Sequence, residues 1–447
     1  MKIMQFGEGN FLRAFVDYMV DAANEAGVTD AHVTIVKAIP AGSLELFRKQ
    51  NFRYTLLTRG RRGGKVIEET RTIASIENAL CAYEDWDGVL TLARDPELGI
   101  VVSNTTEAGI AVSENDAFDA CPPQSYPAKL TKLLYERYLA FDGAPTAGLY
   151  ILPCELIENN ARELERCVRL TAKKWGLPEE FTAWVDSCCP MCVTLVDRIV
   201  TGYSKEESER RGDPLLDIGE PFALWVIEDK ADIKNVFPLD RAGLPVIFTD
   251  DVSPYRERKV RILNGAHTST VLAAYLAGKS IVRECMQDPV ISAYMKNCVN
   301  EEIIPTINLP KAELEQFAAE VFERFDNPFI DHALLSIALN SVSKWKARLL
   351  GSYADYYKIN GIIPRRITFS LAALAAFYCD TDKSKDSPEV LTWFACHKAD
   401  DDFVTELLAN ADFWGEDLNN YPGMTESVTK YLNEIRTKGA YEAMKCL

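Results

Sequence analysis

Long apolar runs are absent from this sequence of 447 residues. The longest apolar stretch, around Phe369–Cys379, has the length of a core helix and is shorter than the roughly 18 residues that a membrane span needs. The first residues, Met1–Gly7, contain no apolar signal region followed by a cleavage site, so we expect a cytoplasmic protein with no membrane partner. Positive charge is also in deficit. Because 49 Lys and Arg stand against 66 Asp and Glu, the net charge of −17 argues against a nucleic-acid partner.

Disulfide and metal-site patterns are scarce as well. The chain has four histidines, and twelve cysteines over this length do not form the dense framework of a small secreted domain, so we expect free thiols. The segment Cys188-Cys189-Pro190-Met191-Cys192 contains one Cys-x-x-Cys pair, but no second Cys or His pair with ligand spacing follows it. We therefore interpret these cysteines as adjacent buried thiols and predict no metal site.

The N-terminal half contains the alternation of strands and helices that is typical of an α/β fold with a parallel sheet. A helix is predicted at Phe11–Ala26, a hairpin with a solvated tip around Arg59–Gly64, and strands at Ile3–Phe6, His32–Ile39, Gly99–Ser103 and Thr146–Pro153. From about residue 255 helical periodicity dominates. We therefore predict a Rossmann-like dinucleotide-binding domain with a β-hairpin insertion over residues 1–250, and a mostly α-helical domain over residues 251–447.

A glycine turn lies between the first predicted strand and its helix. Gly7 and Gly9 permit a tight turn and let backbone N–H groups approach a pyrophosphate. The third glycine of the usual dinucleotide pattern is replaced by Leu12, so an ordinary turn remains an alternative. The acid expected after the second strand is also missing. Lys37 in that strand could favour a 2′-phosphate, which leaves the choice between NAD and NADP open at this point.

A second group of polar residues lies in the predicted helix that contains Lys259, Asn264 and His267. At about 100° per residue, Asn264 lies roughly 140° and His267 roughly 80° from Lys259, so the three share one broad side. Carbonyl reduction needs a proton donor and a donor to the developing alkoxide, which a lysine and an asparagine can supply, while a histidine can hold a substrate hydroxyl. The alternative is a basic helix start on the surface with a capping histidine.

These two segments carry a resemblance to a known family. Lys259-x-Arg261-x-Leu263-Asn264-x-x-His267 resembles the active-site helix of the polyol-specific long-chain dehydrogenase/reductases, the mannitol dehydrogenase family. Gly7-x-Gly9-x-Phe11-x-Arg13 resembles the N-terminal motif of the same family, and this accounts for the missing third glycine. The resemblance extends over nearly the whole chain. It is strongest to members that act on hexuronic acids, through Val101–Ile110 and Pro153–Glu158.

The resemblance implies specific catalytic roles. Lys259 would be the general acid in reduction and the general base in oxidation, Asn264 would steady the oxyanion, and His267 would orient the substrate. Cys154-Glu155-Leu156 stands where mannitol-type members have Cys-Asp-Asn, so Asn160 is our candidate for a second oxyanion donor.

The resemblance also implies NAD as cofactor, with NADP less favoured, and no metal. The pyrophosphate would lie on Gly7, Gly9, Asn10 and Phe11, and the nicotinamide ribose near Asn104, Thr105 and Glu107. A sugar-acid substrate adds a carboxylate that needs a cation. The substrate-binding candidates are Asp197, Arg198 and Lys344, and the further cations considered are Arg258, Lys346 and Arg348.

The function that the resemblance implies is the NAD-dependent, reversible reduction of the keto group of tagaturonate to altronate. The alternatives are a sibling enzyme that uses fructuronate or an uncharged polyol, a sensor that binds NAD without turnover, and a zinc-organised interaction module built on the cysteine segment. We expect a small-molecule sugar acid as the partner and a monomer or small homo-oligomer as the assembly.

Overall fold

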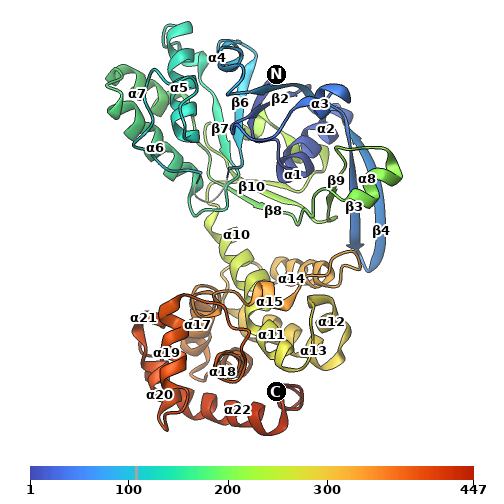
Figure 1. Ribbon diagram of the computed structural model, residues 1–447, viewed down its shortest axis with the longest axis vertical. Helices are drawn as coiled ribbons and strands as arrows, with labels where there is room; N and C mark the ends of the chain where they lie inside the picture. Colours follow the sequence, from blue (N-terminus) through green and yellow to red (C-terminus); the bar gives the residue numbers. More distant parts are fainter. Residues whose placement is uncertain (106–108) are drawn as a thin grey trace. The chain divides into compact units, whose positions relative to one another are not determined.

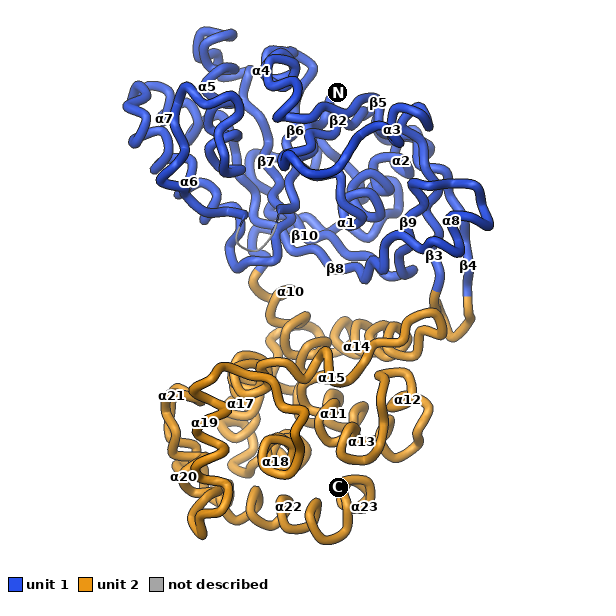
Figure 2. The backbone as a smooth tube through the Cα atoms, in the orientation of Figure 1, with its two compact units in different colours: residues 1–59, 67–252 blue, residues 60–66, 253–447 orange. Residues whose placement is uncertain are grey.

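The computed structural model describes residues 1–105 and 109–447, which form two compact units (Figures 1 and 2). Unit 1 comprises residues 1–59 and 67–252, and unit 2 comprises residues 60–66 and 253–447. None of the described helices combines the length and the apolar character that crossing a bilayer requires.

The centre of unit 1 is a parallel sheet of five strands in the order β5-β2-β1-β6-β7. The strands are β1 (Lys2–Phe6), β2 (His32–Lys37), β5 (Ile76–Cys81), β6 (Leu98–Ser103) and β7 (Tyr150–Pro153). Their central residues are buried, as expected for a parallel sheet that is covered on both faces. The prediction of a Rossmann-like α/β fold followed by a helical region is confirmed.

The strand order of the sheet changes direction at β1. The next strand, β2, pairs with one edge of β1, and the later strand β6 pairs with its other edge. In open parallel sheets, ligands bind beyond the carboxyl ends of the strands at such a switch point. Phe6 is opposite both Val36 and Ser103, so the turn after β1 begins level with the ends of both neighbours.

A continuous helical run follows β1 and comprises α1 (Asn10–Leu12), the π-helix η1 (Arg13–Asp17) and α2 (Tyr18–Glu25). Its residues Phe15 and Met19 join a core that also contains Ile3 and Val102 of the parallel sheet. Trp225 of a second sheet belongs to the same core, and its ring lies 5.6 Å from that of Phe15. That sheet contains β8 (Thr194–Asp197), β10 (Leu224–Glu228) and β11 (Val246–Thr249).

The predicted hairpin is present as β3 (Tyr54–Arg62) and β4 (Lys65–Ile73), and β9 (Asp217–Gly219) pairs with β3. Its tip, residues 60–66, belongs to unit 2. Residues 62–66 of the tip are exposed, as predicted, but the tip is also anchored: Gly63 and Gly64 donate their N–H groups to the Glu323 carboxylate at 3.0 and 2.6 Å. The other helices of unit 1 are α3 (Glu45–Lys49), α4 (Trp86–Ala93), α5 (Tyr126–Ala140), η2 (Pro145–Ala147), α6 (Asn160–Lys174), α7 (Glu179–Cys188), α8 (Lys205–Arg211), α9 (Ile233–Val236) and η3 (Leu239–Ala242).

Unit 2 is helical apart from the hairpin tip. Its core is formed by α11 (Gly265–Leu276) and α18 (Arg365–Asp380), in which residues 265–274 and 367–379 are buried. The longest apolar stretch of the sequence is therefore a core helix, as predicted. The remaining helices are α10 (Ser253–Arg258), η4 (Lys259–Asn264), α12 (Val282–Gln287), α13 (Pro289–Asn297), η5 (Cys298–Ile303), η6 (Ile304–Thr306), α14 (Lys311–Phe325), α15 (Leu334–Ile337), α16 (Ser341–Trp345), η7 (Lys346–Leu350), α17 (Gly351–Asn360), α19 (Pro388–His397), α20 (Phe403–Ala409), α21 (Ala411–Trp414), η8 (Leu418–Asn420), α22 (Met424–Lys438) and α23 (Ala440–Met444).

Candidate active site

Gly7 forms the turn after β1 in a conformation that favours glycine, with φ at +126°. Its N–H donates to the carbonyl of Val36 at 3.1 Å. A Cβ at this position would lie 3.2 Å from the Leu12 side chain and 3.5 Å from the carbonyl oxygen of Asn104. Leu12, which replaces the usual third glycine, is buried and packs directly under the turn.

Gly9 differs from Gly7, because a Cβ placed on it would meet no atom of the described residues within 4 Å. It precedes the first helical residue, Asn10, so the free N–H groups of the helix start lie beside this open side of the turn. Such a start carries positive partial charge and suits a phosphate group. The turn therefore fits the pyrophosphate of a dinucleotide. The side chains of Asn10 and Phe11 are used within the protein: Asn10 accepts a hydrogen bond from Arg13, and Phe11 stacks on Phe15 with ring centroids 5.0 Å apart.

A buried polar network lies beneath the turn, and sequence reasoning missed it. Gln5 donates to the carbonyl of Gly7 at 3.2 Å and to Asp17 at 3.4 Å, and Tyr54 donates to the same carboxylate at 3.4 Å. Burial raises the pKa of Asp17 to about 7, although its contacts with Gln5, Arg13 and Tyr54 act in the opposite direction. Burial likewise raises the pKa of Asp217, which lies 3.8 Å from Arg13, to about 6. The spacing of polar residues in β1 and its helix gave no signal for this network.

The end of β6 lies next to the glycine turn. The N–H of Asn104 donates to the carbonyl of Phe6 at 3.3 Å, and its side-chain amide donates to the carbonyl of Cys154 at 2.6 Å. Thr105 donates both its N–H and its hydroxyl to Glu155, at 2.9 and 3.0 Å. Glu155 is buried, which raises its pKa, and it fixes the segment that we expect near the nicotinamide ribose. The third predicted residue there, Glu107, lies outside the described residues.

Lys37 does not end in solvent. Its side chain is buried and donates to the carbonyls of Ile39 and Pro40 at 2.6 and 3.2 Å. Because the ammonium group holds the loop after β2, its position gives no support to the idea that it selects a 2′-phosphate.

Asn160, the candidate second oxyanion donor, is buried and fully engaged. Its amide NH₂ lies within hydrogen-bond distance of the carbonyls of Pro153, Glu155 and Thr194, and its oxygen accepts from Ala161 and Thr194 at 2.9 and 3.1 Å. These bonds tie the end of β7 to the start of α6 and to β8. The geometry argues against donation to a substrate oxygen, and we assign Asn160 a structural role instead.

Of the two candidates at the end of β8, Asp197 is buried in the second sheet, where it is opposite Leu224 of β10. Arg198 is also buried and connects separate segments of unit 1. It donates to the carbonyls of Ala14 and Glu220 and to the hydroxyl of Thr58. A guanidinium that is bound in this way serves the packing of unit 1, so the geometry argues against Arg198 as the cation for a substrate carboxylate.

The Lys259–His267 segment lies in unit 2, and its first part is not an α-helix. Residues Lys259–Asn264 form the π-helix η4, and the N–H of Gly265 reaches back to the carbonyl of Val260. In a π-helix the hydrogen bonds join residues five apart, so Lys259 and Asn264 lie one turn from each other. The α-helical geometry that we assumed would place them roughly 140° apart. The π-helix therefore brings the amine and the amide closer to a common face than predicted.

His267 follows in the first turn of α11 and is buried. Its ring stacks on Phe325 with centroids 4.1 Å apart and meets His332 edge-on at 5.5 Å. Burial holds the pKa of His267 well below its usual range, and the charges of His332, Arg348, Arg324 and Lys344 lower the pKa further. The imidazole is therefore neutral near pH 7. Its Nε2 is buried and has no hydrogen-bond partner among the described residues, so it can hold a ligand hydroxyl.

The other predicted cations of this unit differ in their surroundings. Arg258 is buried, pairs with Glu313 and lies over the ring of Phe317 at 4.5 Å, so it connects α14 to the end of α10, directly before Lys259. This pairing argues against Arg258 as a carboxylate receptor. Lys344 donates to the carbonyl of Ile337 at 2.8 Å and is half-buried.

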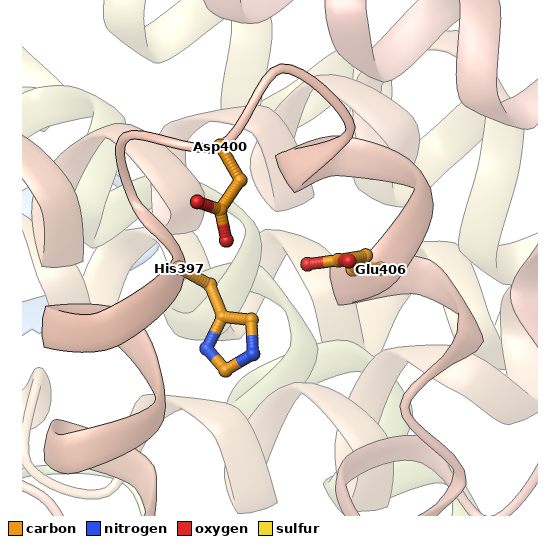
Figure 3. A group of neighbouring side chains, drawn as sticks. All are labelled: His397, Asp400 and Glu406. Carbon is orange, nitrogen blue, oxygen red and sulfur yellow. The ribbon is translucent and has the colours of Figure 1, made fainter.

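The thiols are free, as interpreted from the sequence, and Cys189 and Cys192 are buried, which raises the pKa of each to about 12. A separate group, His397, Asp400 and Glu406, has its ligand atoms within 4.8 Å of one another (Figure 3). Both carboxylates are exposed, and His397 Nδ1 is bound to the carbonyl of Trp393 at 2.8 Å. This exposed trio lies on α19, α20 and the loop between them, away in sequence from every predicted site residue, and we assign it no role.

Unit 1 thus has a Rossmann-like dinucleotide-binding fold with a glycine turn at the switch point of its sheet, and unit 2 carries a lysine, an asparagine and a neutral histidine on one helix. Two family models match: the mannitol dehydrogenase Rossmann domain over residues 1–239 and the mannitol dehydrogenase C-terminal domain over residues 251–436. The chain belongs to the mannitol dehydrogenase family, whose members are oxidoreductases that act on CH–OH groups.

Curated relatives match over the full length. The altronate oxidoreductase of Klebsiella pneumoniae subsp. pneumoniae is 43% identical over 466 aligned residues, which cover 100% of this chain and 96% of the relative. The altronate oxidoreductase of Escherichia coli O7:K1 is 42% identical with the same coverage.

Two solved structures share the fold. Pseudomonas fluorescens mannitol 2-dehydrogenase, in a ternary complex with NAD and D-mannitol, has a TM-score of 0.70 and 22% identity and covers 100% of this chain and 94% of its own. A D-sorbitol dehydrogenase in substrate-free form has a TM-score of 0.83 and 24% identity, with coverage of 99% and 94%.

Proposed function

We propose that this enzyme catalyses the NAD-dependent, reversible reduction of tagaturonate to altronate. The observation that carries the proposal is the full-length identity of 43% to a relative named altronate oxidoreductase, together with the presence of Lys259, Asn264 and His267 in one helical segment. The name of the relative suggests altronate as the product. The helix contains a proton donor and hydrogen-bond donors, which the reduction of a ketone oxygen requires.

The residues of the active-site helix have distinct tasks in the proposed reaction. In reduction, the ammonium group of Lys259 donates a proton to the ketone oxygen, and in oxidation the amine accepts it back from the hydroxyl. The amide NH₂ of Asn264, one π-turn away, donates a hydrogen bond to the same oxygen while negative charge develops on it. His267 is neutral and its Nε2 has no partner among the described residues, so it holds a neighbouring hydroxyl of the substrate in position.

In unit 1, the backbone of Gly7 and Gly9 and the start of α1 would bind the pyrophosphate of the cofactor, and Asn104 and Thr105 would lie near its ribose. Bound NAD(H) would supply or accept the hydride. We favour NAD over NADP because the ammonium of Lys37 is already bound to two loop carbonyls. The proton is carried by Lys259, so the proposed mechanism needs no metal.

Parallel assays of NADH oxidation with tagaturonate, fructuronate and fructose test the proposal. We expect the kcat/KM for tagaturonate to exceed that for each of the other two substrates by at least about 100-fold, the discrimination typical of a site built to recognise polar substituents. Higher turnover of fructuronate would identify a sibling uronate reductase. Equal or higher turnover of fructose would refute a uronate-specific enzyme, and NADH binding without any turnover would indicate a sensor.

A further inference from the structure

Two cations near His267, Arg348 and Lys344, form no ion pair with an acid of the described residues. Arg348, in η7, donates from Nη1 to the hydroxyl of Thr268 at 3.3 Å, directly beside His267 in α11. His332 meets the His267 ring edge-on at 5.5 Å. Lys344 precedes Arg348 by four residues in the same helical segment, which places their like charges on one face.

Other partly buried arginines of unit 2 form ion pairs with acidic side chains. Arg261 pairs with Glu257 and Asp355 at 2.9 and 2.7 Å, and Arg366 pairs with Glu301 at 2.7 Å. Across residues 1–105 and 109–447, by contrast, neither Lys344 nor Arg348 forms an ion pair. The acid whose charge acts on Lys344 is Asp386, and that carboxylate already accepts a 2.6 Å hydrogen bond from Tyr378.

This arrangement is costly for the protein alone. Burial lowers the pKa of Arg348, and burial together with the charge of Arg348 lowers the pKa of Lys344. Two half-buried cations that repel each other destabilise the fold unless an anion neutralises them. The chain has 17 more acidic than basic residues, yet the part that the structure describes pairs no carboxylate with either cation. The missing negative charge is therefore expected to come from a ligand.

We propose that Arg348, assisted by Lys344 and by the ring of His332, binds the carboxylate of the sugar-acid substrate next to His267. This inference rests on the proposed function, because it assumes a uronate substrate. A guanidinium presents two parallel N–H groups that match the two oxygens of a carboxylate, and His267 holds a hydroxyl of the same molecule. Arg348 is thus a specificity-determining residue, which separates a sugar acid from the corresponding neutral sugar.

The test compares tagaturonate with tagatose, the ketose that has a CH₂OH group where tagaturonate has the carboxylate. In Arg348→Met the aliphatic stem is kept and the charge is lost. We expect kcat/KM for tagaturonate to fall by roughly 10- to 100-fold, mainly through KM, because a charge-assisted hydrogen bond is lost in substrate binding. The kcat/KM for tagatose should change by less than about twofold. Arg348→Lys keeps the positive charge but lacks the two parallel N–H groups. Its kcat/KM for tagaturonate should lie between those of the wild type and Arg348→Met.

The matched control is Lys358→Met, which removes a positive charge at an exposed position of α17, the helix that follows η7. It should leave both substrates unaffected. The melting temperature of Arg348→Met should equal or exceed that of the wild type, because the variant relieves the repulsion with Lys344. NADH affinity, measured by fluorescence titration, should not change.

Equal losses for tagaturonate and tagatose, or a lower melting temperature, would show that Arg348 has a structural role and would overturn the inference. An unchanged KM for tagaturonate would overturn it as well. Failure of the proposed function is seen separately in the wild type, as a preference for another substrate. If that substrate is fructuronate, the same comparison with fructose tests Arg348, since the carboxylate is common to both uronates.

Discussion

Replacement of Asp17 by asparagine should make the protein more stable at alkaline pH. The Asp17 carboxyl is completely buried beneath the glycine turn, and its Oδ1 has no hydrogen-bond partner among the described residues. Its pKa is raised from 3.8 to about 7 by burial. The folded state therefore keeps a proton that the unfolded state has already lost, and stability falls as the pH rises from about 4 to about 7.

The size of the effect follows from the two pKa values. Each pKa unit corresponds to about 1.4 kcal/mol, so the shift costs the wild type about 4 kcal/mol once the pH is above 7. Between pH 5 and pH 8 the loss is about 2–3 kcal/mol. The amide introduced by Asp17→Asn would not titrate, and its oxygen could still accept the hydrogen bonds from Gln5 and Tyr54.

The assay is thermal unfolding of the wild type and Asp17→Asn at several values between pH 5 and pH 8. For a unit of this size, we expect the wild type to lose roughly 5–10 °C more than the variant over that range. Asp119→Asn, at an exposed position in the loop before α5, is the control and should follow the wild type. Parallel pH profiles of wild type and Asp17→Asn, or a variant that is less stable at pH 8, would refute the reasoning.

Three further substitutions test the site. Lys259→Ala should lower kcat by about 100-fold or more without changing NADH affinity, as removal of a general acid does, and a near-normal rate would show that another group carries the proton. Gly7→Ala should lower both the melting temperature and the NADH affinity, because its Cβ would press on Leu12. Gly9→Ala should lower the NADH affinity alone. Equal effects of the two variants on both quantities would count against the proposed phosphate turn. Asn160→Ala should lower the melting temperature by several degrees through the loss of buried hydrogen bonds, and kcat should change by less than about 10-fold. A large loss of kcat at an unchanged melting temperature would instead support Asn160 as an oxyanion donor.

The sequence predicts those features that rest on local pattern. The apolar run of β1, the glycine turn and the helix after it follow one another within the first 25 residues, and their order is typical of a dinucleotide-binding fold although it leaves an ordinary turn as an alternative. The motif around Lys259 is also local, so it is visible in the sequence. What local pattern could not show is the π-helix of residues Lys259–Asn264, because its residues have the same apolar spacing as an α-helix start.

The roles of the polar residues depended on partners that are distant in sequence. The sequence shows Arg198 as a basic residue at a strand end, yet it is bound to Ala14 and Thr58, which lie more than 100 residues away. Asn160 is satisfied by Thr194 in the same way. A sequence gives the identity of a donor but not the acceptor that already occupies it, so it overestimates the number of polar side chains that are available to a ligand.

Arg348 and Lys344 differ from the other buried charges of the protein, and we infer that the difference serves the proposed substrate. In unit 1, the guanidinium of Arg13 lies 3.8 Å from Asp217 and lowers the pKa of both Asp217 and Asp17, so a base of the fold offsets part of the cost of burying these acids without a ligand. In unit 2, Arg348 and Lys344 repel each other, and no acid of the described residues pairs with them. If a carboxylate of the protein paired with Arg348, the carboxylate of the substrate would have to displace it, and this would lower the affinity for the substrate. A site that is incomplete in charge until an anionic sugar arrives binds that sugar in preference to a neutral one, because only the acid relieves the repulsion.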